Sequence, residues 1–424
     1  MIVNVNEHSE INIYNESKEC IFTDDNIKEF NKLYKDKDKK YLGLHQEVDN
    51  NITKLKSYYH IGYRWFDEKK EEYIHISPKK SNDGKQADYL AMFLECLKDP
   101  IVSKKLDDSI KIFYNEKWIE TEQKEIDINP FIIFQFLKVV KKISQKGLKK
   151  GYIKVTENLT SKIKGKILVN QTIKQNHFRN RLDKTVCNHQ IFIINCIENQ
   201  IIKTALLQSG RHLQGVESNE ISKMLKQNLN AFELVDKREV FDSDFRTIKH
   251  SPFYKDYKEA LQLAQMIFKR FGFSLNSSDE DKQTKFPPFY IDMPELFERY
   301  VEVKLRKAYP NSLKAFYSLG NGYQTSVGEL RPDFIVKDKK LIIDAKYKYW
   351  FSDDSNKRFK DDFQQLSLYG RVREIRDDIG LKGSNKEANI LFIYPDQDGV
   401  EDIDKNKFIG DFINMQKVGI KIPF

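Results

Sequence analysis

The stretch Arg331-Pro332-Asp333-Phe334-Ile335-Val336-Lys337-Asp338-Lys339-Lys340-Leu341-Ile342-Ile343-Asp344-Ala345-Lys346 decides the fold of the C-terminal part of this 424-residue chain. Residues 333–336 and 341–343 are mainly apolar and suit strands, and residues 337–340 between them suit a charged turn. The stretch therefore predicts a β-hairpin.

Two carboxylates face each other in this hairpin if its turn closes symmetrically, because Asp333 then lies across from Asp344. Like charges that face each other destabilise a sheet, and a divalent cation between them removes the conflict. Lys346 projects from the same face as Asp344, and the Ala345 carbonyl is a further oxygen ligand. Such a cation lowers the pKa of a bound water and polarises a phosphodiester. The stretch predicts metal-assisted phosphodiester hydrolysis; the alternative is a hairpin with ordinary surface charges.

The same residues resemble the PD-(D/E)XK nuclease pattern, with Pro332-Asp333 as its first half and Asp344-Ala345-Lys346 as its second. The resemblance implies a nuclease that uses Mg²⁺, or alternatively Mn²⁺. Asp333, Asp344 and the Ala345 carbonyl would hold the metal, and Lys346 would orient the attacking water.

A helix is expected to begin upstream at Asp292, a suitable N-cap, with Pro294 in its first turn. Glu298 on this helix can face the hairpin, whereas Glu302 precedes Arg306 by four residues and suits an ion pair. The nuclease resemblance implies that a helical glutamate completes the metal site, and Glu298 is the candidate. The alternative is a solvated acid on the helix surface.

A second helix is expected downstream over residues 361–369, with acids in its first turn. Gln365 and Tyr369 share one face of it. This Q-x-x-x-Y pair resembles a motif of one branch of these nucleases, where it lines the active site; the alternative is a polar residue beside a core tyrosine. Residues 389–395 follow as a buried strand that ends at a proline.

Length and composition indicate a soluble globular chain of two or three domains, with 32% charged and 40% hydrophobic residues. No apolar run approaches about 20 residues, so no membrane span is expected, and the N-terminus lacks the pattern of a signal peptide. Neither a zinc site nor a disulfide scaffold is expected, because no C-x-x-C spacing links the cysteines, Cys20, Cys96, Cys187 and Cys196. We therefore expect a cytoplasmic protein.

The positive charge is concentrated in residues 138–184, here called the basic segment. It holds fourteen lysines and arginines against two acids, a net +12 in a chain whose total is +9. Such a concentration predicts a surface that binds the phosphates of double-stranded DNA; the alternative is a solvated, lysine-rich face. The predicted DNA contacts are Lys149, Lys150, Lys164 and Lys166, together with Arg331 and Lys348 beside the hairpin.

The expected fold is α+β and multidomain. Residues 1–125 suit a β-rich domain, residues 126–275 a mainly helical basic region, and residues 287–424 an α/β domain of the PD-(D/E)XK, restriction-endonuclease-like type. Residues 276–284 are polar and suit a linker. The expected elements of the first two regions are a hairpin over residues 59–78 and helices over residues 87–97, 131–143, 190–208 and 255–271.

From about residue 58 onward the chain also resembles the McrC family, the nuclease subunit of McrBC-type 5-methylcytosine restriction systems. The resemblance lies in residues 61–63, 74–80, 147–152, 157–159, 163–167, 198–206, 330–333 and 343–348. It implies that an McrB-like AAA+ GTPase or ATPase hexamer is the partner and that the N-terminal region engages it. The chain itself has no G-x-x-x-x-G-K-[ST] sequence, which agrees with nucleotide hydrolysis by the partner and not by this chain.

Together these features predict a Mg²⁺-dependent endodeoxyribonuclease subunit that cuts foreign DNA, including modified DNA, in a defence system. The alternative is a non-cleaving adaptor that binds DNA and activates a partner NTPase. Substitution of Asp344 separates the two hypotheses, because only the nuclease needs its carboxylate.

Overall fold

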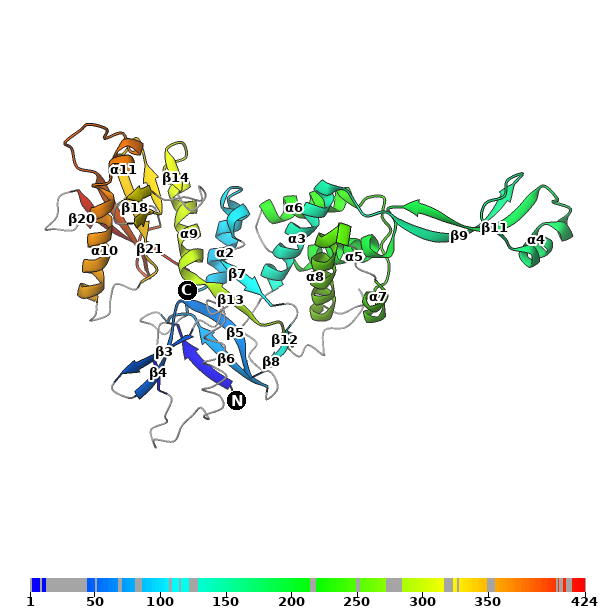
Figure 1. Cartoon of the computed structure of the whole chain (residues 1–424), viewed down its shortest axis with the longest axis horizontal. Helices are drawn as coiled ribbons and strands as arrows, with labels where there is room; N and C mark the ends of the chain where they lie inside the picture. Colours follow the sequence, from blue (N-terminus) through cyan, green and yellow to red (C-terminus); the bar gives the residue numbers. More distant parts are fainter. Residues whose placement is uncertain are drawn as a thin grey trace. The chain divides into compact units, whose positions relative to one another are not determined.

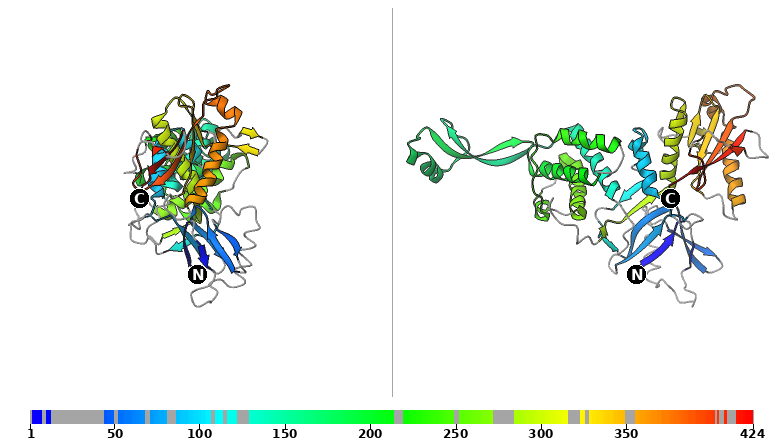
Figure 2. Two further views of the ribbon diagram at one scale, coloured as in Figure 1. Left: turned by 90° about the vertical axis from the view of Figure 1, so that its left-hand side faces the viewer. Right: turned by 180° about the vertical axis from the view of Figure 1, so that it is seen from behind.

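The computed structural model of the chain falls into two compact units (Figures 1 and 2). The first unit joins residues 1–119 to residues 287–424, and the second holds residues 120–286. The segments expected as N-terminal and nuclease-like domains thus belong to one unit. The residues described are 2–7, 10–12, 44–49, 52–67, 71–80, 86–106, 109–113, 116–121, 129–213, 219–248, 252–271, 284–315, 323–325, 328–348, 355–401, 403, 407–408 and 414–423.

A five-stranded sheet in the first unit combines both ends of the chain; we call it the N-terminal sheet. Its strands, in spatial order, are β1 (Ile2–Asn6), β6 (Glu72–Ser77), β5 (His60–Asp67), β13 (Phe289–Asp292) and β7 (Ile110–Ile112). β5 and β6 are antiparallel, which confirms the predicted hairpin. Gly62 allows β13 to approach β5, because a Cβ at this position would lie 2.3 Å from the Phe289 carbonyl oxygen.

Smaller elements accompany the N-terminal sheet. The predicted helix is present as α2 (Tyr89–Lys98), capped by the Asp88 side chain, which accepts a hydrogen bond from Ala91 N at 2.8 Å. The others are the sheet of β2 (Glu10–Asn12), β4 (Ile52–Ser57) and β3 (Leu44–Asp49), and the 3₁₀ helix η2 (Val102–Lys105).

A six-stranded mixed sheet carries the C-terminal part of the first unit. Its order is β14 (Leu313–Ala315), β17 (Phe334–Val336), β18 (Leu341–Ala345), β19 (Asn389–Asp396), β21 (Met415–Lys421) and β20 (Lys407–Phe408). Helices α9 (Met293–Ala308) and α10 (Ser355–Tyr369) lie on either side of it in Figures 1 and 2. Also present are β15 (Tyr323–Thr325), β16 (Gly328–Leu330) and α11 (Arg373–Asp378).

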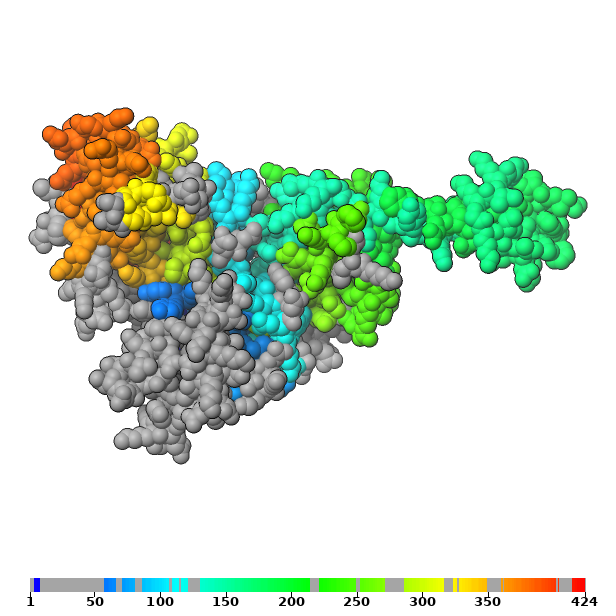
Figure 3. Space-filling model, in the orientation of Figure 1, coloured from blue at the N-terminus to red at the C-terminus, as the bar shows by residue number. Residues whose placement is uncertain are grey.

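The second unit is a helical bundle with a β-arm (Figure 1), and Figure 3 shows how far this arm projects from the bundle. The bundle contains α3 (Asn129–Lys146), α5 (Ile197–His212), α6 (Asn219–Ala231), α7 (Asp242–Thr247), η4 (Pro252–Tyr254) and α8 (Lys255–Phe271). The arm, residues 151–193, contains β9 (Gly151–Thr160), β10 (Lys166–Ile167), α4 (Val169–Gln175), η3 (His177–Arg179) and β11 (Lys184–Ile193). β8 (Ile119–Thr121) and β12 (Thr284–Phe286) form a two-stranded sheet.

Two expectations for the middle region need correction. The helix expected over residues 190–208 begins only at Ile197, because residues 190–193 belong to β11 and pair with β9. Most of the basic segment therefore lies on a β-arm rather than in a helical region. Helix α8 has the predicted bounds, and the expected linker lies outside the described residues except for Thr284.

Candidate active site

The hairpin of β17 and β18 has the predicted register. Phe334 pairs with Ile343 and Val336 with Leu341, so the next pair in the same register is Asp333 with Asp344. The Asp333 Oδ2 atom accepts a hydrogen bond of 2.7 Å from the Ala345 backbone N–H. The two carboxylates thus face each other at the end of the hairpin.

The side chains of Asp344 and Lys346 lie on the side of the sheet that α10 covers. Ile342 packs there in one cluster with Leu366 and Tyr369 of α10. Since side chains alternate along a strand, Asp344 and Lys346 belong to this face as well. The Lys346 Nζ atom lies 2.7 Å from Asp344 Oδ2, and the Asp344 side chain is 1% exposed. A lysine therefore stands beside a buried carboxylate, as the spacing of the two residues predicts.

Burial dominates the electrostatics of this pair. It raises the pKa of Asp344, and burial together with the Asp344 carboxylate raises the pKa of Asp333 to about 8. For Lys346, burial acts to lower the pKa, but Asp344 and Asp333 outweigh it and raise the pKa. A cation close to the two aspartates therefore favours their charged forms, as Lys346 does for Asp344.

Glu298 reaches the same site from α9, whose N-terminus is capped as predicted: Asp292 Oδ1 accepts a hydrogen bond from Glu295 N at 3.1 Å. Burial, and then the charges of Asp333 and Asp344, raise the pKa of Glu298 well above its ordinary value. Its Oε1 atom lies 3.3 Å from Arg299 Nη1. Glu298 is thus close enough to interact electrostatically with the aspartates while its carboxylate pairs with an arginine.

Glu302 forms the ion pair that its spacing predicts. Its Oε1 atom accepts a hydrogen bond of 2.8 Å from Arg306 Nε, and its side chain is fully buried. Its charge also adds to the raised pKa of Glu298, after burial and the charges of Asp333 and Asp344.

Gln365 and Tyr369 do share one helix face, and hydrogen bonds link them to the segment before the hairpin. Gln365 Nε2 donates a hydrogen bond to Tyr369 Oη at 2.8 Å, and Tyr369 Oη donates to the Arg331 carbonyl oxygen at 3.1 Å. This carbonyl lies two residues before Asp333. The pair therefore fixes the backbone that leads into the first aspartate.

Asp362 is a site residue that the sequence analysis missed. Its side chain is 7% exposed, and its Oδ1 atom lies 2.7 Å from Lys348 Nζ. It also acts on the pKa of Asp344 and of Lys346. The sequence analysis expected it in the first turn of a helix that begins at residue 361, but α10 begins at Ser355, so Asp362 lies inside the helix and is buried. Lys348, a predicted DNA contact, is tied to this acid.

The donor set fits a divalent cation through the two aspartates. The Asp344 Oδ2 atom is buried beside Lys346 Nζ, at 2.7 Å, and carboxylate oxygens are ligands that Mg²⁺ prefers. Asp333, Asp344 and the Ala345 carbonyl are the residues that could hold it. Within the described residues, no three or more His, Cys, Asp or Glu side chains are grouped to bind a metal. Glu298 would have to leave Arg299 to contribute.

The predicted DNA-contacting lysines of the second unit differ in their surroundings. Lys164 and Lys166 are exposed on the arm, and Lys150 is exposed at its root. Lys149 instead pairs with Glu198 at 2.5 Å, and its side chain is 17% exposed. The structure thus leaves Lys150, Lys164 and Lys166 open to solvent, whereas Lys149 belongs to the arm root. Arg331 of the first unit is also exposed.

A polar network closes the root of the arm. Asn199, which is fully buried, donates hydrogen bonds to the carbonyls of Lys149 at 2.8 Å and Ile194 at 2.6 Å. Its Oδ1 atom accepts one from Tyr257 Oη at 2.7 Å, and this hydroxyl accepts one from Lys149 N at 2.7 Å. One asparagine therefore holds the chain both where it enters the arm and where it leaves.

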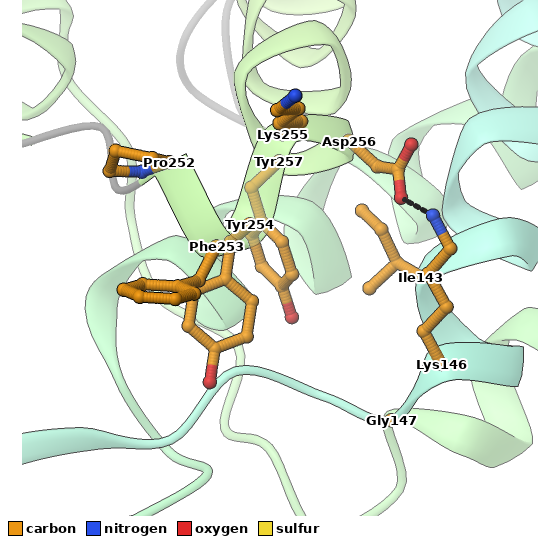
Figure 4. A pocket seen from close by; sticks show the side chains of 9 residues that line it. All are labelled: Ile143, Lys146, Gly147, Pro252, Phe253, Tyr254, Lys255, Asp256 and Tyr257. Carbon is orange, nitrogen blue, oxygen red and sulfur yellow. Dashed lines mark hydrogen bonds and ion pairs between the residues drawn. The ribbon is translucent and has the colours of Figure 1, made fainter.

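A cavity of about 330 Å³ lies beside this root. Figure 4 shows the ion pair of Lys146 and Asp256 (2.6 Å) on one side and Phe253, Tyr254 and Tyr257 on the other.

The described cysteines are free buried thiols, namely Cys96, Cys187 and Cys196; Cys20 lies outside the described residues. Among those residues, no helix has the length and apolarity needed to cross a bilayer.

Comparison with known proteins supplies the family. The family described as McrBC 5-methylcytosine restriction system component matches residues 60–379. The chain belongs to this family. The match includes the hairpin, Gln365 and Tyr369 as well as the whole second unit. The recognition of an McrBC-type protein from the sequence is thereby confirmed.

Two solved structures are similar to this McrBC-family chain. One is a refined half-complex from a tetradecameric assembly of Thermococcus gammatolerans McrB AAA+ hexamers with bound McrC, at 16% identity and a TM-score of 0.40, covering 100% of this chain and 95% of the other. The second is the Thermococcus gammatolerans McrBC complex, at 15% identity and a TM-score of 0.31, covering 86% and 100%. No curated protein sequence matches the chain.

Proposed function

We propose that this McrBC-family chain is the nuclease subunit of its restriction system, a Mg²⁺-dependent endodeoxyribonuclease that cuts foreign DNA in the cytoplasm. The C-terminal sheet with α9 and α10 would be a PD-(D/E)XK core. The observation that carries the proposal is the facing pair Asp333 and Asp344 with Lys346 on the same sheet face. A buried acid that faces a half-buried one is otherwise costly, and a cation between them would remove this cost.

The chemistry follows from the residues of the site. Asp333, Asp344 and the Ala345 carbonyl would hold Mg²⁺ or Mn²⁺, which supplies Lewis-acid activation of the phosphodiester and of water. Lys346 would hold the attacking water and neutralise charge that develops on the phosphate oxygens. Glu298 would complete the site after leaving Arg299. Gln365 and Tyr369 would keep the backbone before Asp333 in place through the Arg331 carbonyl.

DNA binding would come from exposed basic side chains in both units. Lys150, Lys164 and Lys166 of the second unit and Arg331 of the first are exposed. They would contact backbone phosphates, which gives affinity without sequence readout. Lys149 would act through the arm root, and Lys348 through its ion pair with Asp362.

The partner would be an McrB-like AAA+ hexamer that hydrolyses GTP or ATP. The absence of a phosphate-binding loop sequence in the chain supports a separate NTPase. The McrC of Thermococcus gammatolerans is bound to McrB AAA+ hexamers in the structure compared above. The alternative function is a non-cleaving adaptor that binds DNA and activates this NTPase.

Cleavage of plasmid DNA by the purified chain, with Mg²⁺ or Mn²⁺ and with or without its cognate AAA+ protein, tests the proposal. We expect wild type to cut and Asp344→Asn to lose cutting while it retains DNA binding. Asp338→Asn, in the exposed turn of the same hairpin, is the matched control and should cut normally. If no combination cuts while the chain still stimulates the NTPase, the adaptor function is correct.

A further inference from the structure

Tyr59, immediately before β5, contacts the helix that carries Glu298 through its backbone. Its carbonyl oxygen accepts a hydrogen bond of 3.0 Å from the backbone N–H of Met293, the first residue of α9. The next residue reinforces this contact, because His60 Nε2 lies 3.3 Å from Oδ2 of Asp292, the N-cap of α9. The start of α9 is therefore held by the start of β5 and by the residue before it.

The ring of Tyr59 contacts the segment that follows the proposed catalytic lysine. It packs edge-on against the ring of Tyr347, with centroids 6.1 Å apart and an interplanar angle of 77°. Tyr347 is 4% exposed and directly follows Lys346. Its ring also packs against Phe297, the residue before Glu298, at 5.6 Å. Phe297, beside Glu298, and Tyr347, beside Lys346, are thus in direct contact.

A buried ion pair of the N-terminal sheet supports this aromatic cluster from behind. Lys79 Nζ lies 4.6 Å from the ring centroid of Tyr59 and 5.1 Å from that of Tyr347. The same atom lies 3.6 Å from Oε1 of Glu7, whose side chain is fully buried. Glu7 in turn is tied to the end of β6, because its backbone N–H donates to the Ser77 carbonyl at 2.9 Å.

We propose that Tyr59 is a positioning residue for the nuclease site. It holds α9 through its carbonyl and the segment after β18 through its ring, so the N-terminal sheet sets the distance between Glu298 and Lys346. This inference rests on the proposed function and extends it, because it makes the N-terminal segment part of the active-site framework. A force applied to the N-terminal sheet would reach the site through this residue.

The test compares Tyr59→Leu, which removes the ring, with Tyr59→Phe, which keeps it. Tyr73→Leu is the matched control, since Tyr73 is a buried aromatic of the same sheet that packs on Tyr63 and Trp65. In the full complex we expect Tyr59→Leu to lower kcat on the order of 10- to 100-fold, as small misplacements do, with KM for DNA unchanged. Tyr59→Phe should retain the wild-type kcat, and so should Tyr73→Leu.

Hydrogen exchange supplies a readout that does not need cleavage. Exchange in residues 341–348 and at the start of α9 should be faster in Tyr59→Leu than in Tyr73→Leu. If Tyr59→Leu does not fold, the double variant Glu7→Gln and Lys79→Met removes the support behind both rings and should give the same local increase.

Unchanged kcat and unchanged exchange in Tyr59→Leu would overturn the inference, and so would an equal loss of kcat in Tyr73→Leu. A wild-type chain that never cuts would overturn the proposed function alone. The exchange comparison would still decide whether Tyr59 holds residues 341–348.

Discussion

At the scale of single residues, the site is built from acids that repel each other. Asp333 and Asp344 face each other, Glu298 adds a third charge nearby, and Lys346 is the cation beside them. Such an arrangement lowers the stability of the protein, and the cation of the proposed function would offset this cost. The residue that shows this most directly is Asp333, since its pKa is raised to about 8.

This pKa predicts how stability depends on pH. The ordinary pKa of an aspartate is about 4, so between about pH 4 and pH 8 the folded state holds a proton that the unfolded state releases. The free energy of unfolding therefore falls as the pH rises through this range. We expect the thermal midpoint of the metal-free chain to fall accordingly, and Asp333→Asn to raise it at pH 8 by several degrees, at roughly 2–4 °C per kcal/mol.

Magnesium and a turn variant provide the controls. Mg²⁺ should raise the midpoint of wild type at pH 8 but not that of Asp333→Asn, because a ligand stabilises only the state that binds it. Asp338→Asn, in the exposed turn, should behave as wild type. Scanning calorimetry at several pH values measures this, and a midpoint that rises from pH 5 to pH 8 in the metal-free protein would contradict the argument.

At the scale of elements, the sequence predicted those formed by neighbouring residues and missed those that depend on pairing between segments far apart in the sequence. The hairpin followed from two apolar runs around a charged turn, so the register that places Asp333 opposite Asp344 could be deduced. Residues 190–193 gave no such local signal, since they become a strand only by pairing with residues 151–154. The burial of Asp362 and the contacts of Tyr59 likewise depend on neighbours that are distant in the sequence.

The arm root is the element-scale feature with a clear energetic prediction. Asn199→Ala removes hydrogen bonds to the carbonyls of Lys149 and Ile194 and from Tyr257. Buried groups left unsatisfied cost about 1–3 kcal/mol each. We therefore expect a lower midpoint of unfolding for the second unit and faster proteolysis at both ends of the arm. Asn188→Ala, which removes an exposed hydrogen bond to Thr156 on the arm, is the control and should change neither; equal effects would exclude a special role for the root.

At the scale of the whole molecule, charge is separated along the chain. The basic segment carries +12, so the remainder is slightly acidic, and most of the basic segment lies on the arm. If the arm binds DNA phosphates, replacing Lys164 and Lys166 by Glu should weaken binding to all sequences alike. The slope of log affinity against log salt should become shallower by about 2. Titration at several salt concentrations measures it, with Lys382→Glu, exposed in the first unit, as the control; an unchanged slope would place the DNA elsewhere.

The first unit is built from segments at both ends of the chain, and this predicts which fragments of the protein can fold. Strand β13 begins the C-terminal part, yet it lies between β5 and β7 of the N-terminal part and pairs with both. Phe289, Tyr290 and Ile291 are buried there. A fragment of residues 287–424 alone would expose these side chains and leave both edges of β13 without partners, an arrangement that favours aggregation.

We therefore expect residues 287–424 to be insoluble or to unfold without cooperativity when expressed alone. Co-expression with residues 1–119 should restore a soluble complex with a single unfolding transition, because the two pieces then rebuild the N-terminal sheet. Co-expression with Gly62→Val in the N-terminal piece is the control and should fail, since a side chain at this position collides with the Phe289 carbonyl. A fragment of residues 287–424 that unfolds cooperatively by itself would show that the C-terminal sheet is independent, and Tyr59 could then be only an accessory to it.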